Sequence, residues 1–199
     1  MQRNFEESEI LKCLQMCAID KSPGLDGFTM GFFLQCWEAV KEDIMKAFQN
    51  FYEQKIFERS LNATFITLIP KKKGAKELRD FRPISLIGSI YKLCAKVLTE
   101  RMKGVMAKLV DSRQMAFIQG RQIMDAVLIA NEAVDPRQKQ KKPEILCKID
   151  LEKAYDHVNW EYLLNTMGRL GFGRNWIQCM RHHHCEILST YEWIPCWFL

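Results

Sequence analysis

Apolar residues recur at every third or fourth position in five segments of the chain, which is the spacing of an amphipathic α-helix. One segment carries a stripe of large aromatic residues that includes Phe33, Trp37, Phe48 and Phe51. Such a stripe predicts packing in a core rather than a platform for stacking bases. The five predicted helices are residues 5–19, 30–51, 89–110, 159–170 and a helix within 116–135.

Three shorter segments have the composition or alternation of β-strands. Residues 64–70 and 82–86 flank a charged loop, which predicts a hairpin with a long basic tip. In residues 145–151 apolar side chains alternate but also occur on the second face, as in a covered strand. Long helices with a few strands predict a helix-rich α+β fold.

Asp150 lies at the end of the third predicted strand. A carboxylate held there on rigid backbone suits a metal-binding or catalytic acid, whereas the simpler interpretation is a polar strand end that faces water. Asp156, six residues later, is predicted to cap the N-terminus of the helix that follows.

The connectors carry turn signals and helix-end signals. Residues 21–27 combine Pro and Gly into a turn between two helices. Ser89 is predicted to cap the helix that it begins, and Gly171 to end the helix before it. Residues 135–143 are polar and basic with Pro at both ends, which predicts a solvated loop.

Positive charge is concentrated in the middle of the chain. The whole chain carries a formal net charge of +5, yet residues 71–108 hold 11 Lys and Arg against 3 Asp and Glu. A local positive field of this kind suits phosphate groups. Within it, Lys92, Lys96 and Lys103 share a helix face that is either an ordinary solvent-facing surface or a track for a nucleic-acid backbone.

The 8 cysteines include no Cys-x-x-Cys pair. Several lie on apolar faces of predicted elements, where a free thiol packs as a small hydrophobic group. These are Cys13, Cys17, Cys94 and Cys147. We therefore expect a reducing, intracellular setting, the nucleus included, without a disulfide-linked partner. The N-terminal residues lack the apolar run of a secretory signal, and no segment has membrane-spanning length.

Five motifs occur in a fixed order: KSPGLDGF, FITLIPK, FRPISL, FIQGR and DLEKAYD. Together they resemble the reverse transcriptases of LINE-type (non-LTR) retrotransposons, most closely those of plant genomes, over residues 5–180. The resemblance implies a right-hand polymerase fold with fingers, a fingers hairpin and part of a palm with an incomplete sheet. It divides the chain into a helical N-terminal segment (1–60), fingers (61–143) and a partial palm (144–199).

The resemblance also implies roles for individual residues. Asp150 would be the catalytic ligand of Mg²⁺, Tyr155 the gate against ribonucleotides, and Leu151 a nucleotide contact. Arg82 and one of three adjacent lysines would hold the incoming triphosphate, the sequence leaving open which lysine. Arg121 would lie near the template. The lysines are Lys71, Lys72 and Lys73.

The implied function is that of a fragment of an RNA-directed DNA polymerase, with RNA template, DNA primer and dNTP as partners and no membrane. From residue 181 onward the sequence departs from the family, and an Asp-Asp palm motif and a thumb are missing. We therefore expect weak Mg²⁺ binding and no activity from this chain alone. The alternative is a non-enzymatic nucleic-acid-binding remnant.

A zinc site in the tail is a weaker alternative. His182, His183, His184 and Cys185 are ligand types for zinc. Adjacent residues cannot all face one ion, and no second pair of ligands has zinc-site spacing.

Overall fold

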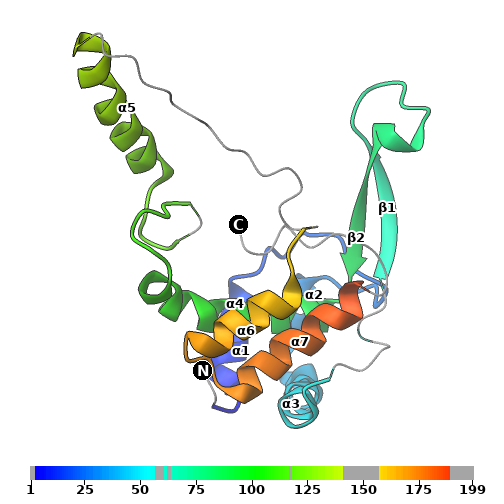
Figure 1. The fold of residues 1–199 in the computed structure, drawn as a ribbon. Coiled ribbons are helices and arrows are strands. Elements are labelled where there is room, and N and C mark those ends of the chain that lie inside the picture. The colour runs from blue at the N-terminus through cyan, green and yellow to red at the C-terminus, as the bar shows by residue number, and fades with distance from the viewer. Residues whose placement is uncertain (1–2, 57–60, 62–63, 117, 141–156, 189–199) are drawn as a thin grey trace.

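The computed structural model describes residues 3–56, 61, 64–116, 118–140 and 157–188, with the side chains of 137–138, 140 and 182–188 left aside. These residues form a helix-rich structure with one two-stranded antiparallel sheet (Figure 1). The helices are α1 (Glu7–Gln15), α2 (Met30–Gln35), α3 (Trp37–Gln54), α4 (Ser89–Leu109), α5 (Ile123–Gln140), α6 (Trp160–Arg169) and α7 (Arg174–Leu188). The strands are β1 (Thr64–Pro70) and β2 (Phe81–Ile87), with the 3-10 helix η2 (Leu78–Asp80) between them.

Helix α4 runs through the helical body, which consists of α1–α4, α6 and α7 (Figure 1). Apart from Ser89 at its start, the buried residues of α4 form one largely apolar face, as its periodicity predicted. Burying such a stripe is the main source of helix stability in a folded protein. The buried face of α4 consists of Tyr91, Leu93, Cys94, Val97 and Leu98.

The aromatic stripe of residues 30–51 lies in this core, as predicted. The prediction of a single helix there was wrong, because the backbone at Cys36 has ψ 18° and divides it into α2 and α3. Thr29 caps α2 by accepting a hydrogen bond from the Phe32 N–H at 3.3 Å. Phe33 and Trp37 are both buried on either side of the break.

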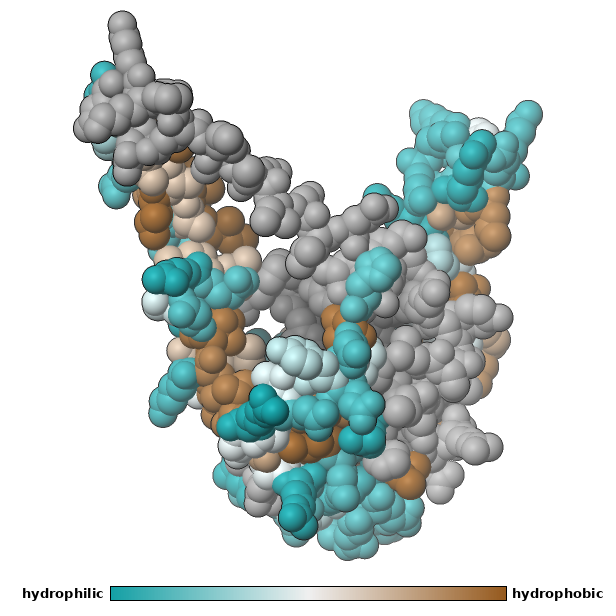
Figure 2. Space-filling model, in the orientation of Figure 1, coloured by the Kyte–Doolittle hydropathy of each residue, from teal (hydrophilic) through white to brown (hydrophobic). Residues whose placement is uncertain are grey.

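The hairpin prediction is confirmed. β1 and β2 pair in register from Thr64 opposite Ile87 to Pro70 opposite Phe81. The hairpin extends from the helical body, with a hydrophilic tip above hydrophobic strands (Figures 1 and 2). Large side chains on both faces are exposed, including Phe65, Leu68 and Ile84. A two-stranded sheet of this kind has little stability of its own, so its direction depends on how its base is held.

Helix α5 extends from the other side of the body (Figure 1) and presents a hydrophobic surface (Figure 2). It includes residues 135–140, so the prediction of a loop starting at Asp135 was wrong. Pro136 removes one backbone N–H donor, but the residues after it favour helix, and Lys139 bonds Asp135 at 2.7 Å.

Helix α6 matches the predicted pattern, with one correction, whereas α7 was not among the predicted helices. Asn159 rather than Asp156 caps α6, accepting from the Tyr162 N–H at 2.9 Å. Gly171 follows the helix with φ +88°, which ends it as predicted. Leu164 and Met167 of α6 are buried in the core with Trp176 and Cys179 of α7. The third predicted strand, residues 145–151, lies outside the described residues.

The described cysteines are free. Cys13 and Cys94 are buried, as predicted, while Cys147 lies outside the described residues. Burial raises the pKa of the Cys13 thiol to about 11, so it stays protonated at neutral pH. None of the helices in the described ranges combines the length and apolar character needed to cross a membrane.

Arg101 of α4 ties the N-terminal residues to the body. Its guanidinium donates to both carboxylate oxygens of Glu9, at 2.7 and 2.6 Å, and to the Arg3 and Asn4 carbonyls at 2.9 Å. It also lies 4.3 Å from the centre of the Phe5 ring. The side chains of Arg101 and Glu9 are 7% and 15% exposed, so this ion pair is largely shielded from water.

We predict that Arg101→Ala lowers the free energy of unfolding by about 3 kcal/mol, because it leaves a largely shielded carboxylate without its partner. Urea unfolding followed by circular dichroism measures the change. Lys46→Ala is the matched control, since its pair with Asp43 is exposed; we expect a change within about 0.5 kcal/mol. Equal effects in the two variants would contradict the importance of the Arg101 contacts.

The same ion pair predicts a pH dependence. Burial raises the pKa of Glu9, but the hydrogen bond and the charge of Arg101 lower it by more than burial raises it. The net shift of the Glu9 pKa is therefore downward. The ion pair therefore stabilises the fold fully above the pKa of an unfolded glutamate, about 4.3, and loses this effect as pH falls through the lower folded pKa. When the free energy of unfolding is measured at a series of acidic pH values, Arg101→Ala should lose less of it per pH unit than the unmodified chain. An unchanged slope would be inconsistent with the ion pair.

Candidate nucleic-acid interface

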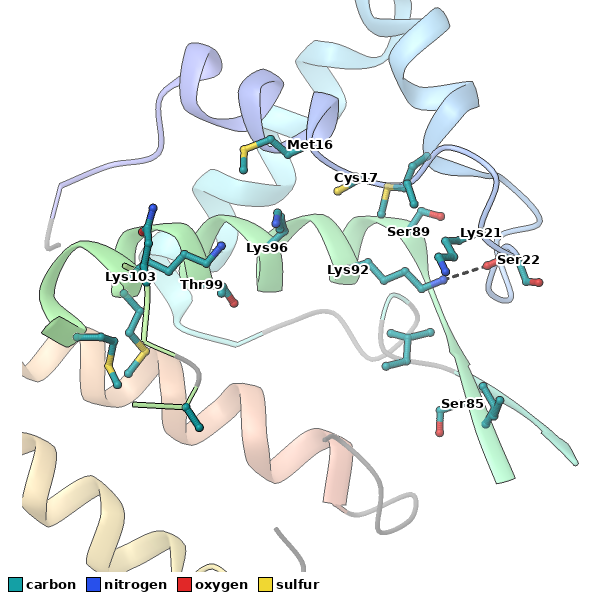
Figure 3. A pocket seen from close by; sticks show the side chains of 18 of the residues that line it. Met16, Cys17, Lys21, Ser22, Ser85, Ser89, Lys92, Lys96, Thr99 and Lys103 are labelled. Atoms are coloured by element: carbon teal, nitrogen blue, oxygen red, sulfur yellow. Dashed lines mark hydrogen bonds between the residues drawn. The ribbon is translucent and has the colours of Figure 1, made fainter. Parts of the chain in front are cut away.

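A cleft of about 1440 Å³ opens along one side of α4 (Figure 3). Four parts of the chain form its walls: residues 16–30, the hairpin strands, α4 itself and residues 110–124. The lining mixes lysines and hydroxyl groups with methionines and other apolar side chains. Such a surface can hold a charged backbone and apolar ring faces together.

Besides Ser89 at its start, four polar residues of α4 line this cleft, and we call them the α4 stripe: Lys92, Lys96, Thr99 and Lys103. Figure 3 shows them in order along the helix, with Lys21 and Ser22 near its first turn. Their spacing places them on one helix face that extends for about 16 Å. The three lysines therefore line a cleft instead of covering a convex outer surface, which favours the second of the two interpretations of their shared face.

The lysines of the α4 stripe are held in place by oxygen partners. The Lys92 Nζ donates to the Ser22 carbonyl at 3.1 Å, and burial lowers the pKa of Lys92 against the opposing effect of Asp26. Glu100 pairs with Lys96 at 3.1 Å and with Lys103 at 2.7 Å. Burial raises the pKa of Glu100, but its bonds to these two lysines lower it overall. One carboxylate thus orders two lysines and leaves the stripe net positive.

At the hairpin tip, the three candidate lysines differ in their partners. The Lys71 Nζ donates to the Arg79 carbonyl at 2.9 Å, and Lys72 pairs with Asp80 at 2.7 Å. The bond from Lys72 is the main cause that lowers the pKa of Asp80. Lys73 is exposed, and its ammonium group has no partner within the described ranges. The tip is thus ordered by two lysines and presents the third.

Arg82 lies on β2 opposite Ile69, and its side chain is exposed. Pro83, the next residue, has a fixed φ, which restrains the backbone beside Arg82 and so the point from which its side chain extends. Arg82 and Lys73 belong to the same hairpin, which also forms one wall of the cleft.

Arg121 has a structural role that its motif did not reveal. Its guanidinium donates to the Asp111 and Gln114 carbonyls at 2.6 Å and to the Ala107 and Val110 carbonyls at 3.2 Å. Positive charge beside the last carbonyls of a helix is stabilising. Arg121 also lines the cleft, and its contact with a template remains a prediction.

Residues 22–28 pack against the point where β2 passes into α4. Asp26, rather than Ser89, caps α4: its Oδ2 accepts from the Ser89 N–H at 2.6 Å. The Ser89 hydroxyl instead donates to the Phe28 carbonyl at 2.7 Å. The prediction of Ser89 as the cap was wrong because the capping carboxylate comes from a residue 63 positions earlier. A lone Asp in a Pro- and Gly-rich turn was the available signal.

Three of the predicted site residues, Asp150, Leu151 and Tyr155, lie outside the described residues. Within the described ranges, no three His, Cys, Asp or Glu side chains gather to hold a metal ion. The His182–Cys185 side chains are likewise outside the described set.

A family model of reverse transcriptase (RNA-dependent DNA polymerase) matches residues 69–197. The chain is also similar to proteins of transposable elements. It is 27% identical over 187 residues to the Transposon TX1 uncharacterized 149 kDa protein of Xenopus laevis, covering 93% of this chain and 14% of that protein. It is 25% identical over 167 residues to the Pol polyprotein of retrotransposable element R2 from Nasonia vitripennis, covering 83% and 15%.

A third relative is the Pol polyprotein of element R1 from Bradysia coprophila, 23% identical over 164 residues, with 81% of this chain and 16% of that protein covered. The chain thus spans about a sixth or less of the length of these relatives. The matched family model covers more than half of the chain and includes the hairpin tip, α4 and α5. The chain therefore belongs to the reverse transcriptase family, in the form carried by LINE-type (non-LTR) retrotransposons.

Proposed function

We propose that this chain is part of an RNA-directed DNA polymerase and that its described portion holds the backbone of an RNA template. The observation that carries the proposal is the α4 stripe, in which three lysines and a threonine follow one helix face along a cleft. Lysine ammonium groups bind phosphates as point charges. The apolar residues of the cleft, such as Met102 and Met106, offer contact to base faces.

In this proposal the N-terminal helices (1–60) lead into fingers (61–143), and residues 144–199 belong to the palm. Lys73 and Arg82, both exposed on one hairpin, are the cations proposed to contact the triphosphate of an incoming dNTP. Members of the family depend in general on divalent metal ions. Asp150 is our proposed ligand for Mg²⁺, with Leu151 and Tyr155 beside the nucleotide and a DNA primer as the second strand.

The non-enzymatic remnant is the second candidate, but no observation favours it over the polymerase fragment. The polymerase fragment and the non-enzymatic remnant both require that the cleft bind nucleic acid through phosphate contacts. Its occupant can therefore be tested on the 199-residue chain without measuring synthesis.

We predict that the chain binds single-stranded RNA of mixed sequence with an affinity that falls as salt rises. Replacing Lys92, Lys96 and Lys103 together by Gln should reduce the slope of log affinity against log salt by about 2, since each lost phosphate contact contributes about 0.7. Fluorescence anisotropy with a labelled RNA measures the slope.

The control for this experiment is a second triple variant, Lys12→Gln with Lys41→Gln and Lys46→Gln. It removes the same charge, but none of its three positions lines the cleft. The control should keep the slope of the unmodified chain. An equal loss in both variants would mean that net charge, not the α4 stripe, determines binding.

Arg121→Ala separates a structural role from a template contact. Loss of the charged hydrogen bonds at the end of α4 should lower the free energy of unfolding by about 1.5–3 kcal/mol. Arg113→Ala, in the same connection, is the control, because only the backbone N–H of Arg113 makes a described hydrogen bond there. If Arg121 also contacts the template, its variant reduces the salt slope by about 0.7 at a temperature where it is folded. A stability equal to that of Arg113→Ala would contradict the capping role.

A further inference from the structure

A single residue, Gly88, connects the end of β2 to the start of α4. The hairpin extends away from the helical body, and much of the apolar surface of its strands is exposed (Figures 1 and 2). Its direction relative to α4 therefore depends on what holds this junction. A loop from outside the hairpin and α4 lies against this junction. It consists of residues 22–28, and we call it the junction loop.

Asp26 makes the central contact of the junction loop. Its Oδ2 accepts from the Ser89 N–H at 2.6 Å, and its Oδ1 accepts from the Phe28 N–H at 3.4 Å. The Ser89 hydroxyl donates back to the Phe28 carbonyl at 2.7 Å. Ser89 is 2% exposed, so its N–H and hydroxyl depend on these partners, although Asp26 and Phe28 are themselves exposed. The carboxylate thus bonds the first residue of α4 and orders its own loop.

Gly24 brings the same loop against the end of β2. A Cβ built on Gly24 would lie 2.4 Å from the Ile87 carbonyl oxygen, closer than any real side chain allows. Glycine permits this approach of two backbones. The junction loop therefore touches β2 through Gly24 and α4 through Asp26, one residue on either side of Gly88.

The junction loop also reaches the α4 stripe. The Ser22 carbonyl accepts from the Lys92 Nζ at 3.1 Å, which orders the first lysine of the stripe (Figure 3). One loop thus contacts the hairpin base, the helix start and the first stripe lysine.

We propose that Asp26 is a positioning residue that fixes the hairpin relative to the α4 stripe, so that Lys73 at the hairpin tip, in the absence of an incoming dNTP, contacts the same RNA as the stripe lysines. The functional half of this inference rests on the proposed RNA-binding function, but the structural half does not. The hairpin alone would turn about Gly88, and its cations would then lose their alignment with the stripe.

The first test measures the distance between the hairpin and α4 in the 199-residue chain without RNA. Spin labels on ketone-bearing amino acids at positions 76 and 108, both exposed, leave the native cysteines untouched. Double electron–electron resonance should give a single narrow distance distribution. Asp26→Ala should broaden it and shift its mean, whereas Asp26→Asn should restore the narrow distribution, since an amide oxygen can still accept from the Ser89 N–H.

An unchanged distribution in folded Asp26→Ala, even with a lower melting temperature, would overturn the proposal, as would failure of Asp26→Asn to restore it. If Asp26→Ala does not fold, Gly24→Ala decides the question. It keeps the carboxylate but forces the junction loop off Ile87, so the mean distance must shift; an unchanged mean would overturn the proposal.

The second test measures RNA binding by anisotropy. Lys73→Gln should weaken binding in the otherwise unmodified chain and in Asp26→Asn, because the hairpin is held in place in both. In Asp26→Ala the effect of Lys73→Gln should be lost. Equal weakening in the unmodified and Asp26→Ala backgrounds would contradict the functional half. Because the distance measurement contains no RNA, a failure of the RNA-binding proposal is distinguishable from a failure of the positioning role.

Discussion

The burial of one face of α4 is the constraint on which the rest of the structure depends. Tyr91, Leu93, Cys94, Val97 and Leu98 pack into a core shared with α1, α2 and α3. Once this face is buried, the opposite face has only one orientation, and the lysines on it line the cleft. A helix thus fixes the position of its polar residues through the packing of its apolar ones.

Both ends of α4 are capped by charged side chains from other segments. Asp26 bonds the first N–H of the helix, and Arg121 bonds carbonyls at its end. Each charge has the sign that complements the helix dipole at its end. In the second half of the helix, Arg101 holds the N-terminal residues through Glu9. Capping and ion pairing therefore connect three distant segments to one helix.

The distribution of positive charge has a finer pattern than the sequence count indicates. Arg101 is buried in an ion pair, while Lys71 and Lys72 bond groups of the hairpin tip. These cations stabilise the structure. Lys73 and Arg82 are instead exposed on the hairpin, and the α4 stripe lines the cleft. Lys73 and Arg82 can bind phosphates without giving up a described contact, whereas the stripe lysines would exchange their bonds to the Ser22 carbonyl and Glu100 for phosphate contacts.

Periodicity and motif order in the sequence determined much of this protein: α4 and α6, the hairpin, the aromatic core and the family. These features depend on neighbours in the chain or on short turns, so local patterns reveal them. The tertiary structure alone decided the break at Cys36, the cap from Asp26 and the carbonyl contacts of Arg121. It also distinguished Lys73 from Lys71 and Lys72. These features depend on which backbone groups and side chains meet in space. A cap supplied by a residue 63 positions away leaves no periodic signal in the sequence.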